Sequence, residues 1–293
     1  MKTTTVTLTL AVLFAFLLFA FVFAFLLAGA AFQFAVAADL SPDNLSPNNA
    51  RNGAPSEAAA PVLVELFTSE GCSSCPPADA LLGKLDGLQP IAGAQAIVLS
   101  EHVDYWNHDG WKDAYSSSFF TDRQKDYERR FRLGSPYTPQ MVIDGAVEVN
   151  GSDARAVAGA IETARGHAKI RVRISSVSLA NAKALRVHLE VDALPGDFKA
   201  RKADILVAVA LNHAESHVSG GENKGRDIQH VAVAESIGKV GTVEKGKSFD
   251  RDVLVKVKST ADPDLANLRL IAFVQESDGG EVVGAALVSA PTK

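Results

Sequence analysis

The sequence has very little cysteine. Cys72 and Cys75 are the only two cysteines among its 293 residues, and two serines separate them. An exported protein that depends on disulfides for stability carries several cysteines spread along the chain. A bond between Cys72 and Cys75 would close a very small loop and add little stability. A disulfide framework is therefore excluded, and the pair needs another explanation.

Basic clusters are also lacking. The chain has 29 Lys and Arg against 34 Asp and Glu, with a net charge of −5. Neither a basic stripe nor a run of basic and aromatic residues is found, which argues against a nucleic-acid partner. The sequence contains no internal repeat, and no Ser/His/Asp arrangement or carboxylate pair that would indicate a hydrolase.

Long apolar runs are absent after the N-terminus, where one extends from about Leu10 to Phe32. Lys2 precedes this run and Ala35-Val36-Ala37 follows it, which predicts a secretory signal peptide over residues 1–37. The run is also long enough to span a bilayer, so an uncleaved anchor is the alternative. Both interpretations predict a periplasmic or secreted protein that contacts the membrane only through this segment.

Residues 38–60 are rich in Ser, Pro, Asn and Ala and predict a flexible linker. The pattern then changes. Pro61–Phe67 is typical of a buried strand, Pro76 and Pro77 suit the first turn of a helix, and Ala96–Ser100 predicts a second strand. Strand, helix and strand in this order indicate a parallel βαβ unit.

The next segments complete an α/β domain over residues 61–166. Ser118 to Arg132 predicts a charged surface helix. Met141–Ile143 predicts a strand, and Asp144-Gly145 predicts a tight hairpin turn into a return strand over 146–149. Ser152 or Asp153 is expected to cap a last helix that runs to about Arg165.

From Lys169 onward, apolar residues alternate with polar ones in about seven short segments. Ile170, Val172 and Ile174 begin this pattern, which is typical of half-buried strands. It predicts an all-β, sandwich-like domain over residues 167–293. The expected fold class is therefore α/β, a thioredoxin-like domain followed by a β-sandwich-like domain.

The cysteine spacing has a chemical reading. Thiol exchange needs a thiolate, and a helix N-terminus lowers the pKa of a nearby cysteine. Cys72 is expected there as the nucleophile, and Cys75, one turn later, as the thiol that resolves a mixed disulfide. The alternatives are an inert disulfide and metal handling. A structural zinc site needs four ligands, and no histidine has ligand spacing to this pair. Neither a metal nor an organic cofactor is therefore expected.

Two further site residues are expected from the thioredoxin-like pattern. In such folds a loop ending in cis-proline lies against the cysteines, and Thr138-Pro139 is placed to be that loop. Glu65, on the strand before the cysteines, is a candidate buried acid for proton transfer to Cys75. Its offset from Cys72 is one residue longer than in thioredoxin, and a shift of one residue turns a strand side chain to the other face.

At this point the chain resembles a family. The motif ELFTSEGCSSCPPAD over residues 65–79, with later blocks HVDYW, GWKD, YTPQMV and GENKGR, is similar to a secreted bacterial thioredoxin-like family known only as a domain of unknown function. The resemblance covers nearly everything after the linker. It implies a thioredoxin-like fold with a β-rich C-terminal part, and it supplies no substrate.

Other polar residues have open roles. His102, Asp104, Trp106 and Trp111 follow the second strand, where they line a substrate groove or pack an insertion. The Gly221–Arg226 loop does not match a phosphate-binding loop, and we expect it to dock the β domain onto the thioredoxin-like domain.

The leading hypothesis is an extracytoplasmic thiol–disulfide oxidoreductase or redox-responsive protein that acts on protein thiols or disulfides of the cell envelope. The rival is a non-enzymatic binding module with a structural disulfide. Exposure of Cys72 favours the first hypothesis, and its burial favours the second.

Overall fold

The computed structural model describes residues 59–257, 264–277 and 279–290. The expected signal peptide or anchor, and all but the last two residues of the expected linker, lie outside this range. Residues 57–293 form one compact unit. No helix in the described part of the chain is long and apolar enough to cross a membrane.

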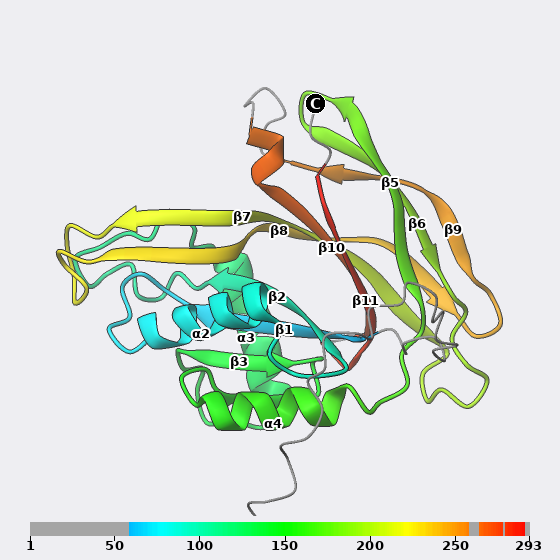
Figure 1. The fold of residues 1–293 in the computed structure, drawn as a ribbon, viewed down its shortest axis with the longest axis horizontal. Helices are drawn as coiled ribbons and strands as arrows, with labels where there is room; N and C mark the ends of the chain where they lie inside the picture. Colours follow the sequence, from blue (N-terminus) through cyan, green and yellow to red (C-terminus); the bar gives the residue numbers. More distant parts are fainter. Residues whose placement is uncertain (1–58, 258–263, 278, 291–293) are drawn as a thin grey trace, which may run out of the picture. The chain divides into compact units, whose positions relative to one another are not determined.

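The N-terminal half has the expected order of elements (Figure 1). These are β1 (Ala60–Thr68), α2 (Pro76–Leu88), β2 (Ala94–His102), α3 (Ser118–Phe131), β3 (Gln140–Ile143), β4 (Val147–Asn150) and α4 (Ala154–Ala164). β1 pairs with β2 in parallel and with β3 in antiparallel fashion, and β4 pairs with β3 in antiparallel fashion. This is a thioredoxin-like arrangement that begins with a βαβ unit.

Local sequence explains where these elements begin and turn. Pro76 and Pro77 take the first positions of α2, where a missing N–H is tolerated. Asp153 caps α4 by accepting hydrogen bonds from two backbone N–H groups, at 3.0 and 3.1 Å. Asp144 and Gly145 both have positive φ, 48° and 61°, as a two-residue hairpin turn requires.

Seven strands follow, as the alternation predicted. They are β5 (Val172–Asn181), β6 (Ala184–Val191), β7 (Lys202–His217), β8 (Asp227–Glu244), β9 (Phe249–Lys256), β10 (Leu268–Glu276) and β11 (Val282–Ser289), with a short 3-10 helix at Asp264–Asn267. They do not form a sandwich of their own. β8 pairs with β2 at Ser100 and Val233, so one eight-stranded sheet runs β11-β10-β7-β8-β2-β1-β3-β4. The expected boundary near Gly166 falls between α4 and β5, and strands from both sides of it share this sheet.

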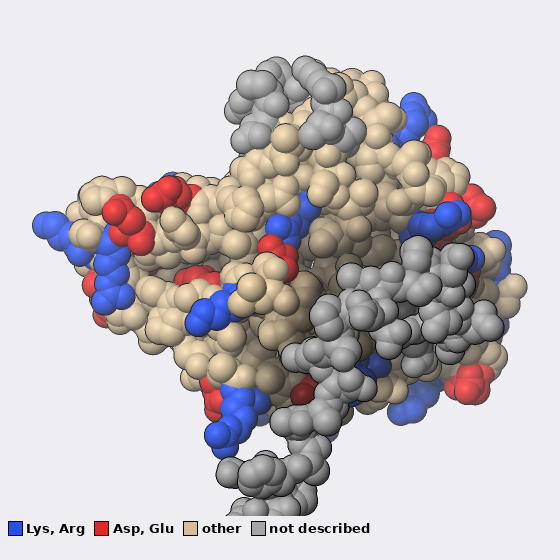
Figure 2. Space-filling view, in the orientation of Figure 1, with Lys and Arg blue, Asp and Glu red and all other residues tan. Residues whose placement is uncertain are grey.

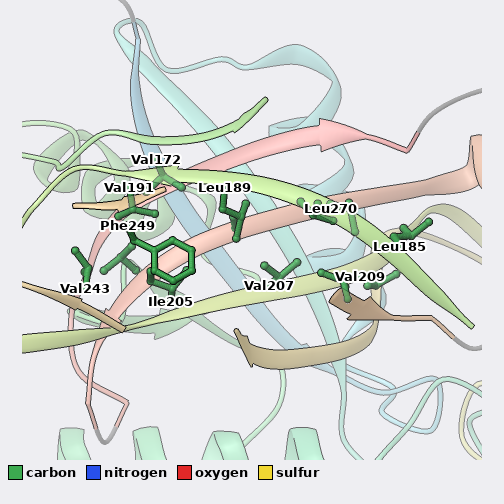
Figure 3. Close-up of a cluster of buried hydrophobic side chains, with 14 of the residues drawn as sticks. Val172, Leu185, Leu189, Val191, Ile205, Val207, Val209, Val243, Phe249 and Leu270 are labelled. Carbon is green, nitrogen blue, oxygen red and sulfur yellow. The ribbon is translucent and has the colours of Figure 1, made fainter. Parts of the chain in front are cut away.

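The sandwich-like part lies at one end of this sheet. β5, β6 and β9 form a separate three-stranded antiparallel sheet. Its side chains pack on those of β7, β8 and β10, and Figure 3 shows Leu189 and Phe249 directed toward Ile205 and Val207. This hydrophobic core stabilises the C-terminal half.

The two faces of β1 contact different helices, and this decides which residues can reach the cysteines. Val62, Val64 and Leu66 pack with α2 and α4, whereas Phe67 packs with Tyr127 of α3 on the other face. A side chain at position 65 therefore lies on the α3 face. On the molecular face shown in Figure 2, acidic and basic side chains are interspersed.

Candidate redox site around the Cys72–Cys75 disulfide

The two cysteines form a disulfide at the start of α2. Cys75 is the N-cap of this helix, and Cys72 lies in the turn that precedes it. Both cysteines are fully buried, while Ser73 and Ser74 between them are exposed. The pair is therefore in the predicted place, but Cys72 is covered.

The first turn of α2 has no free backbone N–H for the Cys72 sulfur. Pro76 and Pro77 have none, and the N–H groups of Ala78 and Asp79 both donate to the Cys75 carbonyl, at 2.8 and 3.1 Å. The Ser74 hydroxyl lies 3.4 Å from the Cys72 sulfur. A Cys72 thiolate would thus be stabilised by the helix dipole and this hydroxyl, and not by N–H groups of the first helical turn.

The Thr138–Pro139 peptide bond is cis, as predicted. The loop lies against the cysteine turn, because the Ser74 hydroxyl donates to the Thr138 carbonyl at 3.5 Å. The Thr138 hydroxyl accepts a hydrogen bond from the Trp106 indole at 2.9 Å. The structure thus brings Cys72, Cys75, Thr138 and Pro139 together.

A hairpin from the C-terminal half covers the cysteine turn. We call residues 218–226, which connect β7 to β8, the hairpin tip. Within it, the Asn223 amide donates to the carbonyls of Glu70 and Cys72, both at 2.9 Å, and the Glu222 carboxylate accepts from the Ser73 N–H at 3.3 Å. The loop therefore docks on the thioredoxin-like part, as expected, and does so on the cysteine pair itself.

Glycine at position 220 makes this docking possible. A Cβ there would lie 2.3 Å from the Gly110 carbonyl oxygen, closer than any real contact. Gly221 has a φ of +66° and packs on Trp111. The glycine-flanked tip and the GWKD segment therefore meet backbone to backbone.

The relay role expected for Glu65 is not supported, and the reason is the strand face. Glu65 is buried on the α3 side of the sheet, where it accepts hydrogen bonds from Arg123 and, at 2.6 Å, from the Tyr127 hydroxyl. The same guanidinium lies 3.5 Å from Glu101. Burial, and then repulsion from Glu65, raise the pKa of Glu101 well above its usual value. This network joins α3 to the sheet and lies away from α2.

His102 at the end of β2 and Asp104 after it have structural partners. His102 pairs with Asp113 at 2.7 Å, while Asp104 accepts a hydrogen bond from Thr121 at 2.6 Å. His102 and Asp104 are therefore not partners. Burial alone would raise the pKa of Asp113, but His102 and two backbone N–H groups outweigh it and lower the pKa.

The chain matches the family described as "Protein of unknown function (DUF1223)" over residues 63–275, which is most of its length. It belongs to this family. No curated protein matches the chain.

Two solved structures share the DUF1223 chain's architecture. Protein AGR_C_4864 of Agrobacterium tumefaciens is 26% identical, with a TM-score of 0.62, over 82% of this chain and 98% of that one. HBP35 of Porphyromonas gingivalis is 15% identical, with a TM-score of 0.59, over 80% of this chain and 76% of that one. The second likeness concerns the fold alone.

Sequence reasoning missed three buried residues near the cysteine turn of this DUF1223 chain: Asn223, Asp79, and His230, whose ring lies 3.7 Å from the Asp79 carboxylate. Asn223 was seen only as part of a docking loop, and Asp79 only as part of a motif. His230 gave no signal, because it approaches α2 only when β8 joins the sheet beside β2. The one available clue was that Asp79 follows Cys75 by four residues, which places both on one helix face.

Proposed function

We propose that this protein is an extracytoplasmic thiol–disulfide exchange protein, with Cys72 as the nucleophile and Cys75 as the resolving thiol. The observation that carries the proposal is the disulfide at the start of α2, with the cis Thr138–Pro139 loop beside it. The export pattern in residues 1–37 supports a location outside the cytoplasm, where protein thiols and disulfides are the partners.

The exchange proceeds through a mixed disulfide. A partner thiolate attacks the Cys72 sulfur, the Cys72–Cys75 bond breaks, and Cys75 leaves as a thiolate that takes up a proton. In the reverse direction the Cys75 thiolate attacks Cys72 and releases the partner thiolate. Because the hairpin tip covers Cys72, the tip must move before a partner can approach.

A trapping experiment tests this function. The full chain carrying Cys75→Ser is reduced and incubated with oxidised glutathione, and its intact mass is measured. The expected result is one glutathione on Cys72, because the mixed disulfide cannot be resolved. The matched Cys72→Ser variant is expected to react more slowly. Absence of the adduct in the Cys75→Ser variant would contradict the proposal.

The burial of both cysteines favours a second candidate, a binding module in which the disulfide fastens the turn under the hairpin tip. In that case neither single-cysteine variant forms an adduct while the chain is folded. Both variants would also keep the fold, since a loop of this size contributes little stability.

A further inference from the structure

Several ionisable side chains are buried between the cysteine turn and β8, and the exchange steps above give them no role. All of them are nearly inaccessible to solvent, with an exposed fraction of 6% for Asp79 and 2% or less for each of the other members. The group consists of Glu70, Asp79, His102, Asp113 and His230. Burying so many ionisable groups costs free energy, and such clusters concentrate at functional sites.

The cluster contains one hydrogen-bonded pair and one side chain without hydrogen bonds. His102 and Asp113 are hydrogen-bonded to each other, and Asp113 also accepts from the Glu70 N–H at 2.9 Å. His230 is different. Its ring lies 3.7 Å from both the Glu70 and the Asp79 carboxylates, and neither ring nitrogen has a hydrogen-bond partner among the described residues. His230 is therefore held by the charges of Glu70 and Asp79 and by no hydrogen bond of its own.

Asp79 is the member of this group that lies beside the resolving cysteine. It follows Cys75 by one helical turn, its N–H donates to the Cys75 carbonyl at 3.1 Å, and both residues are buried. One carboxylate oxygen accepts from the Thr68 hydroxyl at 3.4 Å, at the end of β1. The other oxygen is buried and has no hydrogen-bond partner in the described structure. A buried carboxylate oxygen without a donor is able to accept a proton.

A path to solvent begins at the same residue. A groove of about 610 Å³ lies between α2 and β8, and Asp79 lines it together with Pro76, Lys84 and Arg226. A proton taken up inside the site can leave through this groove while the hairpin tip stays closed. Glu65, which is enclosed by Arg123 and Tyr127 on the other face of the sheet, has no access to this groove.

We propose that Asp79 accepts the proton of the Cys75 thiol and that His230 and Glu70 position it, so that β8 of the C-terminal half completes the redox site. This inference rests on the proposed exchange function and extends it. In the resolution step Asp79 takes the thiol proton, and the Cys75 thiolate attacks the Cys72 sulfur. The Cys72–Cys75 bond forms, the bond from Cys72 to the partner sulfur breaks, and the partner leaves as a thiolate. The partner disulfide is the oxidant.

The charges of the cluster fit this role. Burial alone would lower the pKa of His230, but Asp79 and Glu70 outweigh it and raise the pKa to about 9. Burial would raise the pKa of Glu70, but the His230 ring at 3.7 Å and the hydrogen bond from the Trp111 indole outweigh it and lower the pKa. His230 is therefore cationic at neutral pH and remains paired with Glu70 when Asp79 is protonated. Outside the cluster, Tyr115 packs on His102 and His230, and Lys84 and Arg226 line the groove beside Asp79.

The test uses the reduced full chain mixed with excess dithiobis(nitrobenzoate), which releases one coloured thiolate at each step. The first phase reports attack by Cys72 and depends on reagent concentration. The second reports resolution by Cys75 and does not. We expect Asp79→Asn to leave the first phase intact and to slow the second at pH 7 by about tenfold, a modest share of what a positioned base contributes. In Asp79→Asn the rate of the second phase should rise more steeply with pH than in the wild type. Asp79→Glu should restore part of this rate.

Three controls separate this role from a structural one. Asp86→Asn removes another carboxylate of α2, one that pairs with Arg269, and is expected to lower stability without changing the pH profile. His230→Gln tests the group independently of Asp79 and should slow the second phase in the same direction. Glu65→Gln tests the rival relay and should leave both phases unchanged.

The outcomes are distinct. A normal second phase with an unaltered pH profile in Asp79→Asn and His230→Gln overturns the inference and leaves the exchange function standing. A change confined to Glu65→Gln overturns it in favour of the rival relay. Absence of the first phase in the wild type refutes the exchange function, and this inference with it.

Discussion

Removal of the Asn223 amide should expose the disulfide. In the closed structure this amide makes two hydrogen bonds, to the Glu70 and Cys72 carbonyls, and its residue is fully buried. Each buried hydrogen bond contributes about 1 kcal/mol, so Asn223→Ala should weaken the closed tip by about 2 kcal/mol. Because about 1.4 kcal/mol corresponds to a tenfold change, the open population should rise by about thirtyfold.

The assay is the rate of reduction of the Cys72–Cys75 disulfide by excess dithiothreitol, followed by alkylation and mass measurement. When tip opening precedes attack as a rapid equilibrium, the rate increases in proportion to the open population. Ser219→Ala, which changes an exposed residue of the same tip, is the matched control and should reduce at the wild-type rate. An Asn223→Ala rate equal to that of wild type would refute the reasoning, since the tip would then not limit access.

Three other predictions follow from separate contacts. Gly220→Ala should also accelerate reduction, because its Cβ would lie 2.3 Å from the Gly110 carbonyl oxygen; an unchanged rate would mean that the tip tolerates the displacement while closed. The stabilisation from His230, whose pKa is about 9 in the folded state against about 6.5 when unfolded, is complete below pH 6.5 and is lost as the pH rises through 9. The difference in the free energy of unfolding between wild type and His230→Gln, measured with denaturant, should therefore shrink by about 3 kcal/mol between these pH values. A difference that does not change with pH would contradict the ion pairing. Glu65→Gln should lower the free energy of unfolding by about 3 kcal/mol, because the buried Arg123 loses its nearest carboxylate, and a redox defect without a loss of stability would contradict its structural role.

Much of the fold follows from local sequence. The βαβ order, the Asp144-Gly145 turn, the proline-started helix and the alternation from Lys169 each depend on neighbouring residues, and each was predicted in place. The shared sheet was not predicted, because it depends on a single parallel pairing of Ser100 with Val233, residues far apart in the chain. Periodicity gives the strands but not their order.

The sequence likewise predicted some residues of the site correctly and missed others. The cysteines and the Thr138–Pro139 loop have fixed spacings and a known geometry, so the sequence placed them correctly. Glu65 was assigned to the relay by its distance along the strand, and the one-residue offset places it on the opposite face. Asn223 reaches the Cys72 carbonyl, and His230 reaches Glu70 and Asp79, only through the long β7–β8 hairpin, whose direction is a tertiary property.

The most direct test of the central claim is the redox equilibrium of the Cys72–Cys75 pair in glutathione buffers, read by thiol alkylation and mass with Cys72→Ser as the control. The account predicts a reversible transition between about −120 and −270 mV, the range of exchange catalysts. A pair that stays oxidised below about −300 mV and resists alkylation would contradict it, and the disulfide would then be a structural element of a binding module.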